Sequence, residues 1–469
     1  MLTIHKNMKT SVSEIFAAQK TKQSALKTSS VAQRKQTLKK LKTLIQQNEL
    51  AIFEALKQDL GKPLFEAAVT EVYFVYAEID FALKNLSKWV KPKRVAPTLT
   101  SLFTKNRIVY EAKGLSLIIS PWNYPFQLAI SPLVSAIAAG NGVVLKPSEL
   151  SPATSALLYT LISTNFAVEE IACVEGDAEV AKELLSLPFD HIFFTGSTTI
   201  GKVVMRAAAE HLASVTLELG GKSPAVITES AALEKAAEKI VWGKFLNVGQ
   251  TCIAPDYVLL PEHLLEKFVD LVSQNIHKLF TRNGQANAEA YGSIINSRHF
   301  ERQKKLFDDA LAKGAQLRIG GQFDANTLRI SPTVLSKVPL DSGLMQEEIF
   351  GPLLPLITYK SLEEALTYIN AQGKPLALYV FGNSAIAKQV IAQTSAGGTL
   401  VNDVLVHISN PNLPFGGVQS SGTGSCHGFY GFKAFSHERS VMYQSAIDFN
   451  WMVYPPYKMS LLKLLKKLF

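Results

Sequence analysis

Short apolar runs alternate with helical segments between residues 115 and 212, and this alternation restricts the possible folds more than any other feature of the chain. The apolar runs are LSLIIS (115–120), NGVVLKP (141–147), IACVEG (171–176) and HIFFTG (191–196), and the helical segments lie near 126–139, 151–164, 178–187 and 198–212. Strands that are separated by helices in this way form βαβ units with a parallel sheet. The sequence therefore predicts an α/β domain over this part of the chain.

A second alternation follows Ser223 and predicts a second α/β domain. Its strand candidates are PAVIT, YVLLPE, PTVLSKV, PLLPLITY and LALYVFG, and its helices are expected at 231–247, 263–280 and 298–313. Before the first alternation the pattern is helical from Ser30, which forms a capping box with Gln33. Residues 92–112 are expected to form an extended arm or hairpin. Residues 404–469 are rich in Gly, Ser and aromatic residues and are expected to be irregular up to a basic helix at the end.

Residues 114–145 carry no charge, and a hydropathy scan could mistake them for a membrane span. The hydrocarbon core of a bilayer requires an unbroken helix of about 20 residues, whereas PWNYP and Pro132 interrupt this run. We therefore expect a strand, a turn, a helix and a second strand inside a buried core. The N-terminus has charges where a signal peptide needs an apolar segment, so secretion is not expected.

The composition narrows the class of function. The chain has 469 residues, of which 47% are apolar and 19% are charged, as is typical of globular proteins. Its net charge of +9 is mild, and no basic stripe interleaved with aromatic residues is found in the interior, so nucleic acid is not an expected partner. The three cysteines lack disulfide or zinc spacing, and the nine histidines lack metal-ligand spacing. We therefore expect no metal site and a reducing, cytoplasmic location.

Two predicted strand ends carry candidate ligand-binding residues. In FFTGSTTIGK, Gly196 and Gly201 occupy a turn between a strand and a helix, where phosphate groups often bind. The spacing matches neither a dinucleotide-binding fingerprint nor a P-loop, so a plain turn is the alternative. In VLKPSE, Lys146 and Glu149 could hydrogen-bond a pair of ribose hydroxyls, or they could form a solvated turn.

Three further residues are candidates for chemistry. Glu218 ends an apolar strand before Gly-Gly, and a carboxylate in that position must be paired or chemically employed, because burial is costly and raises its pKa toward the range of a general base. Cys252, in GQTCIAPD, is either a nucleophile or an inert core thiol. Asn123 lies in a turn between two prolines. Of the other cysteines, Cys173 is expected in the core and Cys426 on a surface loop.

Seven motifs, in this order along the chain, resemble those of the aldehyde dehydrogenase superfamily. They are SPWNYP, VLKPSE, FFTGS, LELGGKSP, GQTCIAPD, QEEIFGP and LPFGGVQSSGTG. The C-terminal part, with VND, GFYGFKAFSHERSVMYQ and YPPY, resembles the branch that contains the class 3 and fatty aldehyde dehydrogenases. One departure is Gln419, which stands where glycine is common in the family.

The resemblance implies a fold and a division into domains. We expect a Rossmann-like cofactor domain, a second α/β catalytic domain and a small oligomerisation element. The expected boundaries are 1–91 with 113–218 for the cofactor domain, 219–403 for the catalytic domain, and 92–112 with 404–469, including the basic helix, for oligomerisation. A homodimer is the expected assembly.

The resemblance also implies the role of each catalytic residue. Cys252 would attack the aldehyde carbonyl, and the side-chain amide of Asn123 with the backbone N–H of Cys252 would stabilise the oxyanion. Departure of a hydride to the nicotinamide would leave a thioester. Glu218 would then activate the water that hydrolyses this thioester.

By the same resemblance, NAD is the expected cofactor, and NADP is also possible. The expected cofactor-binding residues are Lys146 and Glu149 at the adenosine ribose, Gly196, Ser197 and Gly201 at the pyrophosphate turn, and Glu348 and Phe350 at the nicotinamide ribose. A carboxylate at Glu149 that faces the ribose 2′-position favours a hydroxyl over a phosphate and hence NAD.

Two alternative functions stay open, a CoA-acylating dehydrogenase and a non-catalytic binding protein on the same fold. Glu218 argues against the first, and the combination of Cys252, Glu218 and Asn123 argues against the second. Tyr124, Phe245 and Leu246 suggest an apolar tunnel for medium-chain, long-chain or aromatic aldehydes. The tail KMSLLKLLKKLF places leucines and lysines on opposite sides of a helix. We expect it to cover the substrate entrance or a neighbouring subunit; contact with a membrane surface is the less favoured alternative.

Overall fold

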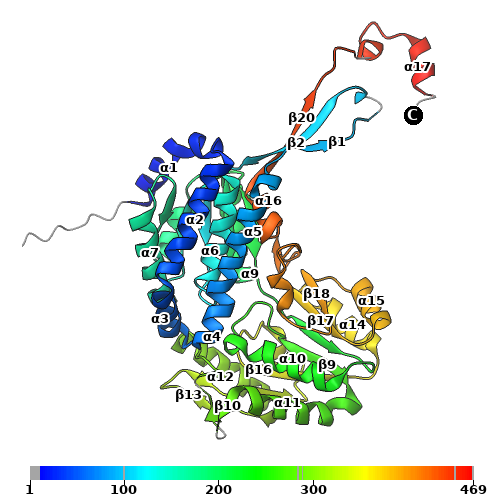
Figure 1. Ribbon diagram of the computed structural model, residues 1–469. Helices are drawn as coiled ribbons and strands as arrows, with labels where there is room; N and C mark the ends of the chain where they lie inside the picture. The colour runs from blue at the N-terminus through cyan, green and yellow to red at the C-terminus, as the bar shows by residue number, and fades with distance from the viewer. Residues whose placement is uncertain (1–10, 99–100, 283–284, 288, 448–449, 467–469) are drawn as a thin grey trace, which may run out of the picture.

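The computed structural model describes residues 11–98, 101–282, 285–287, 289–447 and 450–466 (Figure 1). The first alternation folds into a sheet with the order β19-β7-β6-β3-β4-β5. Its parallel strands are β3 (Leu115–Ile119), β4 (Gly142–Lys146), β5 (Ile171–Cys173), β6 (His191–Thr195) and β7 (Ser214–Glu218). The short strand β19 (Gly422–Thr423) pairs with β7 in the antiparallel direction. The predicted Rossmann-like α/β fold is therefore confirmed.

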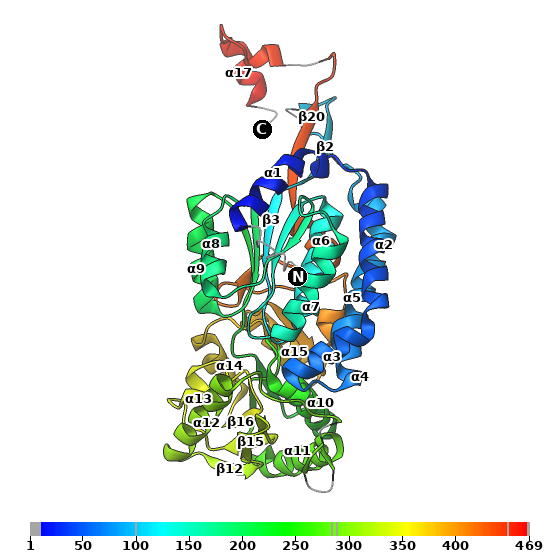
Figure 2. The same ribbon diagram turned by 90° about the vertical axis from the view of Figure 1, so that its left-hand side faces the viewer.

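Helices cover both faces of this sheet (Figure 2). The crossover helices are α6 (Gln127–Ala139), α7 (Pro152–Asn165), α8 (Ala178–Leu185) and α9 (Thr198–Glu210). α8 and α9 lie on one face, and α6 and α7 lie on the other. The uncharged run 114–145 thus forms β3, a turn, α6 and β4, as predicted, and α6 continues through Pro132. Within the described part of the chain, no helix is both long and apolar enough to cross a membrane.

A helical segment precedes the sheet in the chain. It consists of α1 (Val12–Lys27), α2 (Val31–Gln47), α3 (Glu49–Leu60), α4 (Leu64–Ala67), a π-helical turn (Ala68–Val72) and α5 (Tyr73–Trp89). Helices α2, α3 and α5 pack on the α6 side of the sheet, whereas the buried residues of α1 join the core on the α8 side. The predicted capping box of Ser30 and Gln33 is present. The prediction missed α1, although Ser11 and Glu14 form a second capping box at its start. Gly61 ends α3 in the left-handed conformation.

The second alternation forms a sheet with the order β12-β15-β16-β9-β8-β17-β18. Its strands are β8 (Pro224–Ile227), β9 (Tyr257–Pro261), β12 (Gln316–Ile319), β15 (Thr333–Ser336), β16 (Leu353–Tyr359), β17 (Ala377–Phe381) and β18 (Gly398–Val401). The helices are α10 (Leu233–Phe245), α11 (Leu265–Phe280), α12 (Ser297–Ala312), α13 (Gly343–Gln346), α14 (Leu362–Ala371) and α15 (Ser384–Gln393). Two small hairpins are β10 (Thr281–Arg282) with β11 (Gln285–Ala286) and β13 (Phe323–Asp324) with β14 (Arg329–Ile330). A second α/β unit is therefore present.

An arm projects from the first domain (Figure 1). It contains β1 (Lys93–Val95), β2 (Lys105–Ala112) and β20 (Ser436–Tyr443), in the order β1-β2-β20. The hairpin expected over 92–112 is confirmed. The expectation that 404–469 is irregular up to its last helix is wrong, because α16 (Gly428–Ala434) and β20 interrupt it. β20 pairs with β2 from Ser436 to Tyr443, a partner more than 300 residues away that the local pattern does not reveal.

The C-terminal segment leaves the arm and ends away from both sheets in both views (Figures 1 and 2). It carries a short 3-10 turn (Asn450–Val453) and α17 (Met459–Leu465). Met459 and Leu462 of α17 are exposed. The predicted tail helix thus begins as expected, but it does not pack over its own subunit. Lys467 to Phe469 of this prediction lie outside the described residues.

Candidate functional site

The candidate residues gather where the order of the first sheet reverses, between β3 and β6. The turn after β3 carries Asn123, Gly196 and Ser197 follow β6, and Glu218 ends β7. In an open α/β sheet such a reversal opens a crevice at the carboxyl ends of the strands, where ligands bind. The sheet therefore brings together residues from distant parts of the chain; Asn123 and Glu218, for example, are 95 positions apart.

Cys252 lies on an irregular loop between α10 and β9. The loop begins with a tight 3-10 turn, Leu246–Gly249, in which Asn247 and Val248 have φ values of 50° and 57°. The Cys252 side chain is partly buried. Burial, followed by the negative charges of Glu348 and Glu218, raises the pKa of its thiol to about 12. The thiol is therefore protonated near neutral pH, and it must lose its proton before it can act as a nucleophile.

Glu218 is buried, and neither of its carboxylate oxygens has a hydrogen-bond partner among the described residues. Burial raises the pKa of this carboxyl to about 8, and the nearby thiol of Cys426 partly offsets that effect. A carboxylic acid with such a pKa can exchange a proton near neutral pH. An unpaired buried carboxylate is costly, so its retention at a strand end points to a chemical role.

Glu218 and Cys252 line the same narrow cavity, whose volume is about 30 Å³. This is the space open to the centre of a water molecule, and about 10–15 Å³ on that measure is enough to hold one water. The other walls are mainly apolar and include Leu128, Phe193, Leu219, Ile408 and Phe415. The arrangement places a thiol, a potential base and room for water together inside an apolar enclosure.

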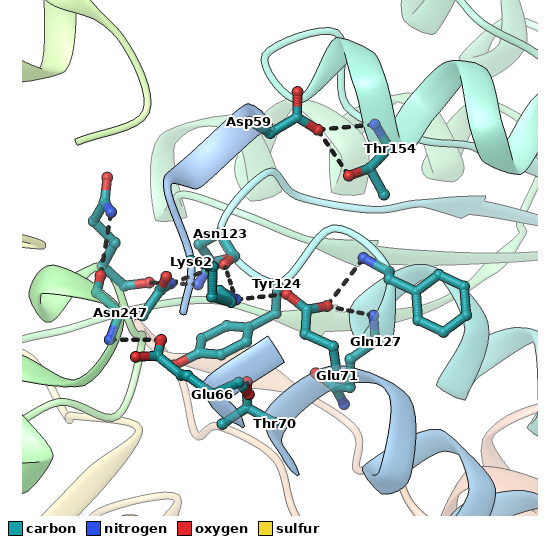
Figure 3. Close-up of polar contacts among 12 residues, drawn as sticks. Asp59, Lys62, Glu66, Thr70, Glu71, Asn123, Tyr124, Gln127, Thr154 and Asn247 are labelled. Carbon is teal, nitrogen blue, oxygen red and sulfur yellow. Dashed lines mark hydrogen bonds and ion pairs between the residues drawn. The ribbon is translucent and has the colours of Figure 1, made fainter. Parts of the chain in front are cut away.

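Asn123 is held against the loop that carries Cys252 (Figure 3). Its side-chain Nδ2 donates to the Gln250 carbonyl oxygen at 3.0 Å, and its own carbonyl oxygen accepts from Nδ2 of Asn247 at 2.8 Å. The hydroxyls of the next residue, Tyr124, and of Thr251 are 2.7 Å apart. A primary amide has two N–H donors, so Asn123 can donate to Gln250 and still offer one hydrogen to a ligand.

The expected ribose-binding pair lies at the end of β4. Lys146 is buried, and its Nζ is 3.1 Å from Oε2 of the exposed Glu149. The same Nζ also donates to the Pro147 carbonyl oxygen. The pair thus forms at the strand end that the sequence predicts. The Glu149 carboxylate remains exposed.

The three residues predicted for the pyrophosphate site, Gly196 and Ser197 in the turn after β6 and Gly201 in α9, have different structural roles. Ser197 is the N-cap of α9 and accepts a hydrogen bond from the Ile200 N–H. Gly196 donates its N–H to the Glu218 carbonyl oxygen. Gly201 faces the sheet, where a methyl group on it would lie 2.6 Å from Cδ2 of Leu219. Gly201 therefore allows α9 to approach the strand end closely.

Glu348 and Phe350 come from the second α/β unit and reach the junction of the two sheets. Burial, and then the charge of Asp256, raise the pKa of Glu348 to about 7, while the Gly221 N–H lowers it. Phe350 has φ 51°, and its ring meets that of Trp122 edge-on at 5.4 Å between centroids. Both residues therefore lie near the strand ends of the first sheet, Phe350 beside Trp122 and Glu348 beside Gly220.

Some expectations about the surroundings of the site are wrong. Cys426 is buried and lines the cavity beside Glu218 rather than lying on a surface loop. Phe245 is buried against the Phe280 ring in the core, so it does not contribute to a tunnel. Cys173 is buried in β5, as expected. Gln419 has φ 58°, the backbone conformation that glycine would adopt with less strain.

Sequence reasoning missed two groups near the site. His427 lines the cavity, and its Nδ1 lies 3.7 Å from Oε1 of Glu78. Lys62, Glu66 and Glu71 contact the Asn123 turn and the Cys252 loop (Figure 3). In the sequence these residues are only charges in and beside helical segments, which is the ordinary pattern of a solvent-exposed surface.

Comparison with known proteins finds similar chains that are named as aldehyde dehydrogenases. The chain is 44% identical over 434 residues to the 4,4'-diaponeurosporen-aldehyde dehydrogenase of Staphylococcus aureus, covering 92% of this chain and 93% of that protein. It is 44% identical over 423 residues to the dimeric NADP-preferring aldehyde dehydrogenase of Rattus norvegicus, covering 90% and 92%.

A solved structure of Staphylococcus aureus AldH in a substrate-bound state superimposes with a TM-score of 0.93 at 41% identity, covering 98% of this chain and 99% of that one. The family model described as "Aldehyde dehydrogenase family" matches residues 1–441. The chain therefore belongs to the aldehyde dehydrogenase family.

Proposed function

We propose that this NAD(P)-dependent aldehyde dehydrogenase oxidises apolar aldehydes to carboxylic acids through a thioester on Cys252. The observation that carries the proposal is the single cavity that holds both the Cys252 thiol and the unpaired Glu218 carboxylate. A thiol and a carboxylate are the two groups that a covalent oxidation followed by hydrolysis requires.

In the first half-reaction, the Cys252 thiol gives its proton to water, and the resulting thiolate adds to the aldehyde carbon and turns the carbonyl oxygen into an oxyanion. The free N–H of the Asn123 amide and the backbone N–H of Cys252 stabilise this charge; one such donor is worth about 3–4 kcal/mol in other enzymes. The carbonyl re-forms as the hydride leaves, and the product is a thioester. NAD(P), when bound, accepts the hydride.

In the second half-reaction, Glu218 takes a proton from water, and the resulting hydroxide attacks the thioester carbon. The C–S bond breaks, the acid leaves and Cys252 returns as a thiolate. Glu218 acts on a water molecule held in the mainly apolar cavity beside the thioester.

The residues at the carboxyl ends of β4 and β6 suit a dinucleotide. Lys146 and Glu149 present a donor and an acceptor for ribose hydroxyls, and the N-terminus of α9 with Ser197 suits the pyrophosphate. Gly196 keeps the backbone open there. Glu348 and Phe350 would hold the nicotinamide ribose between the two domains. The domains would then be 1–91 with 113–218 for cofactor, 219–403 for catalysis and 92–112 with 404–469 for assembly.

The apolar cavity walls support aldehydes with apolar chains or rings as substrates. The Staphylococcus aureus relative is named as a 4,4'-diaponeurosporen-aldehyde dehydrogenase. For the assembly, the relative from Rattus norvegicus is named as dimeric, and the projecting arm offers unpaired strand edges to a second copy. All three cysteines are free thiols, which supports a cytoplasmic location.

Separating the half-reactions tests the proposal. Cys252→Ala should abolish NADH formation from NAD and an aldehyde, while Cys173→Ala, a matched cysteine in the core, should retain it. Glu218→Gln should form NADH once and then stop, because an amide cannot accept the proton of water. Mass spectrometry should then find the acyl group on Cys252.

Two results would contradict the proposal. Turnover by Cys252→Ala would exclude the thioester, and the absence of any NADH burst in Glu218→Gln would mean that Glu218 acts before hydride transfer. The same assay with CoA decides the remaining alternative, since turnover that depends on CoA would indicate a CoA-acylating enzyme.

A further inference from the structure

A fully buried ion pair lies beside the proposed oxyanion site. The side chains of Lys62 and Glu71 are both 0% exposed, and Lys62 Nζ is 2.6 Å from Glu71 Oε1. Removing two charges from water costs free energy that their attraction often fails to recover. The proposed reaction uses neither residue, so the pair needs another explanation.

The pair holds both ends of the turn that contains Asn123 (Figure 3). Lys62 Nζ is 3.4 Å from the Asn123 carbonyl oxygen and 4.1 Å from the centre of the Tyr124 ring. Oε2 of Glu71 accepts hydrogen bonds from the N–H groups of Phe126 and Gln127, at 3.1 and 2.8 Å. These N–H groups begin α6, where a carboxylate is favoured.

Glu66, on the same segment, holds the loop that carries Cys252. Its Oε1 accepts from the Asn247 N–H at 3.0 Å. Asn247 has positive φ, an uncommon conformation that persists only where the surroundings enforce it. The Asn247 side chain then donates to the carbonyl oxygens of Asn123 and Gln250, at 2.8 and 3.1 Å.

We propose that Lys62, Glu66 and Glu71 form a clamp that sets the position of Asn123 relative to the Cys252 loop. The two proposed oxyanion donors, the Asn123 amide and the Cys252 N–H, come from different α/β units, and the clamp joins their supports. Oxyanion stabilisation depends on donors that are fixed before the charge develops. Lys62, Glu66 and Glu71 are therefore positioning residues; the inference rests on the oxyanion role of Asn123 in the proposed function.

A double-mutant cycle on the full chain tests the clamp. The rate of the first NADH formed is measured by rapid mixing with NAD and a short soluble aldehyde, for wild type, Lys62→Met, Asn123→Ala and the double variant. Lys62→Met should lower the rate about 10- to 100-fold, since a misplacement of about 1 Å can cost that much. Its KM for NAD should stay within about twofold of wild type. In the Asn123→Ala background, Lys62→Met should change the rate less than about twofold.

Lys62→Met leaves the buried charge of Glu71 without its ionic partner and could prevent folding, which a thermal unfolding measurement would reveal. Glu71→Gln is therefore measured in the same cycle. The matched control is Asp59→Asn. The Asp59 carboxylate accepts from the N–H groups of Ala153 and Thr154 at the start of α7 but does not contact the Asn123 turn (Figure 3). Asp59→Asn should combine with Asn123→Ala multiplicatively.

Three outcomes would overturn the clamp. If the rate losses of Lys62→Met or Glu71→Gln multiply with that of Asn123→Ala, these residues act independently of Asn123. If Asp59→Asn shows the same coupling, the effect is general loosening. If Asn123→Ala alone keeps the wild-type rate, the oxyanion assignment itself is wrong and the clamp fails with it.

Discussion

At the scale of single residues, burial raises the pKa values of two acidic side chains, with a different consequence for each. It raises the pKa of the Cys252 thiol to about 12 and that of the Glu218 carboxyl to about 8, because a low-dielectric environment disfavours both anions. For Cys252 this means a protonated resting state. For Glu218 it means a stronger base that is still available near neutral pH.

The pH dependence of thioester hydrolysis follows from the raised pKa of Glu218. The carboxyl is protonated and inactive as a base below its pKa, so hydrolysis should be lost as the pH falls through about 8 and should level off above it. The measurement is the decay of acylated enzyme over a pH series, with Glu218→Gln as the flat, slow control. A wild-type rate that does not change across this range would contradict the assignment.

At the scale of elements, the packing of α9 on the sheet decides where the pyrophosphate turn lies. Gly201 is buried on the side of α9 that meets Leu219, the residue directly after Glu218. The helix can approach this strand end only because residue 201 lacks a side chain. The sequence associates Gly201 with the cofactor. In the structure, Gly201 affects that site by allowing α9 to lie close to the sheet.

Gly201→Ala should therefore destabilise the protein although alanine is the better helix former. Overpacking typically costs about 1–3 kcal/mol, against a gain of about 1 kcal/mol in helix propensity. We expect a lower urea midpoint and weaker NAD binding, measured by fluorescence titration. The control is Lys202→Ala at the exposed neighbouring position, which should change neither. A Gly201→Ala variant that unfolds at higher urea than wild type would refute the packing argument.

At the scale of the whole molecule, the arm and the C-terminal segment extend beyond the body (Figures 1 and 2). β20 returns the chain to β2, and α17 follows at the far end of the arm. In this position α17 cannot cover the site of its own subunit. If the tail covers a substrate entrance, the entrance belongs to the second subunit of the proposed dimer.

Deletion of residues 458–469 tests this arrangement. If α17 covers the partner's entrance, the KM for long-chain aldehydes should change several-fold, while turnover of a short soluble aldehyde should stay within about twofold. Neither form should sediment with anionic vesicles. Sedimentation of the intact enzyme that is lost on deletion would show a membrane-surface helix instead, to which lysines contribute about 1 kcal/mol each on anionic lipid.

Much of this protein follows from local sequence patterns. The alternation of short apolar runs and helices predicts the central strands of both sheets and several of their helices, for example α6 at 127–139 against an expected 126–139, but it misses β12, β18, α14 and α15 in the second unit. Such patterns succeed because a buried strand and an amphipathic helix are defined by residues close together in the chain. The roles of Cys252, Glu218 and Asn123 are implied by the resemblance of their motifs to a known family, whereas the local pattern alone leaves plainer explanations open.

Only the tertiary structure shows what joins these elements. The pairing of β20 with β2, the burial of Cys426 beside Glu218 and the contacts of Lys62, Glu66 and Glu71 with the Asn123 turn all connect distant parts of the chain. Lys62 and Glu71 illustrate the reason. In the sequence they are two charges nine residues apart, and charges usually face solvent. The folded chain pairs them with each other, and the Asn123 turn and the start of α6 supply the further polar contacts that a buried pair requires.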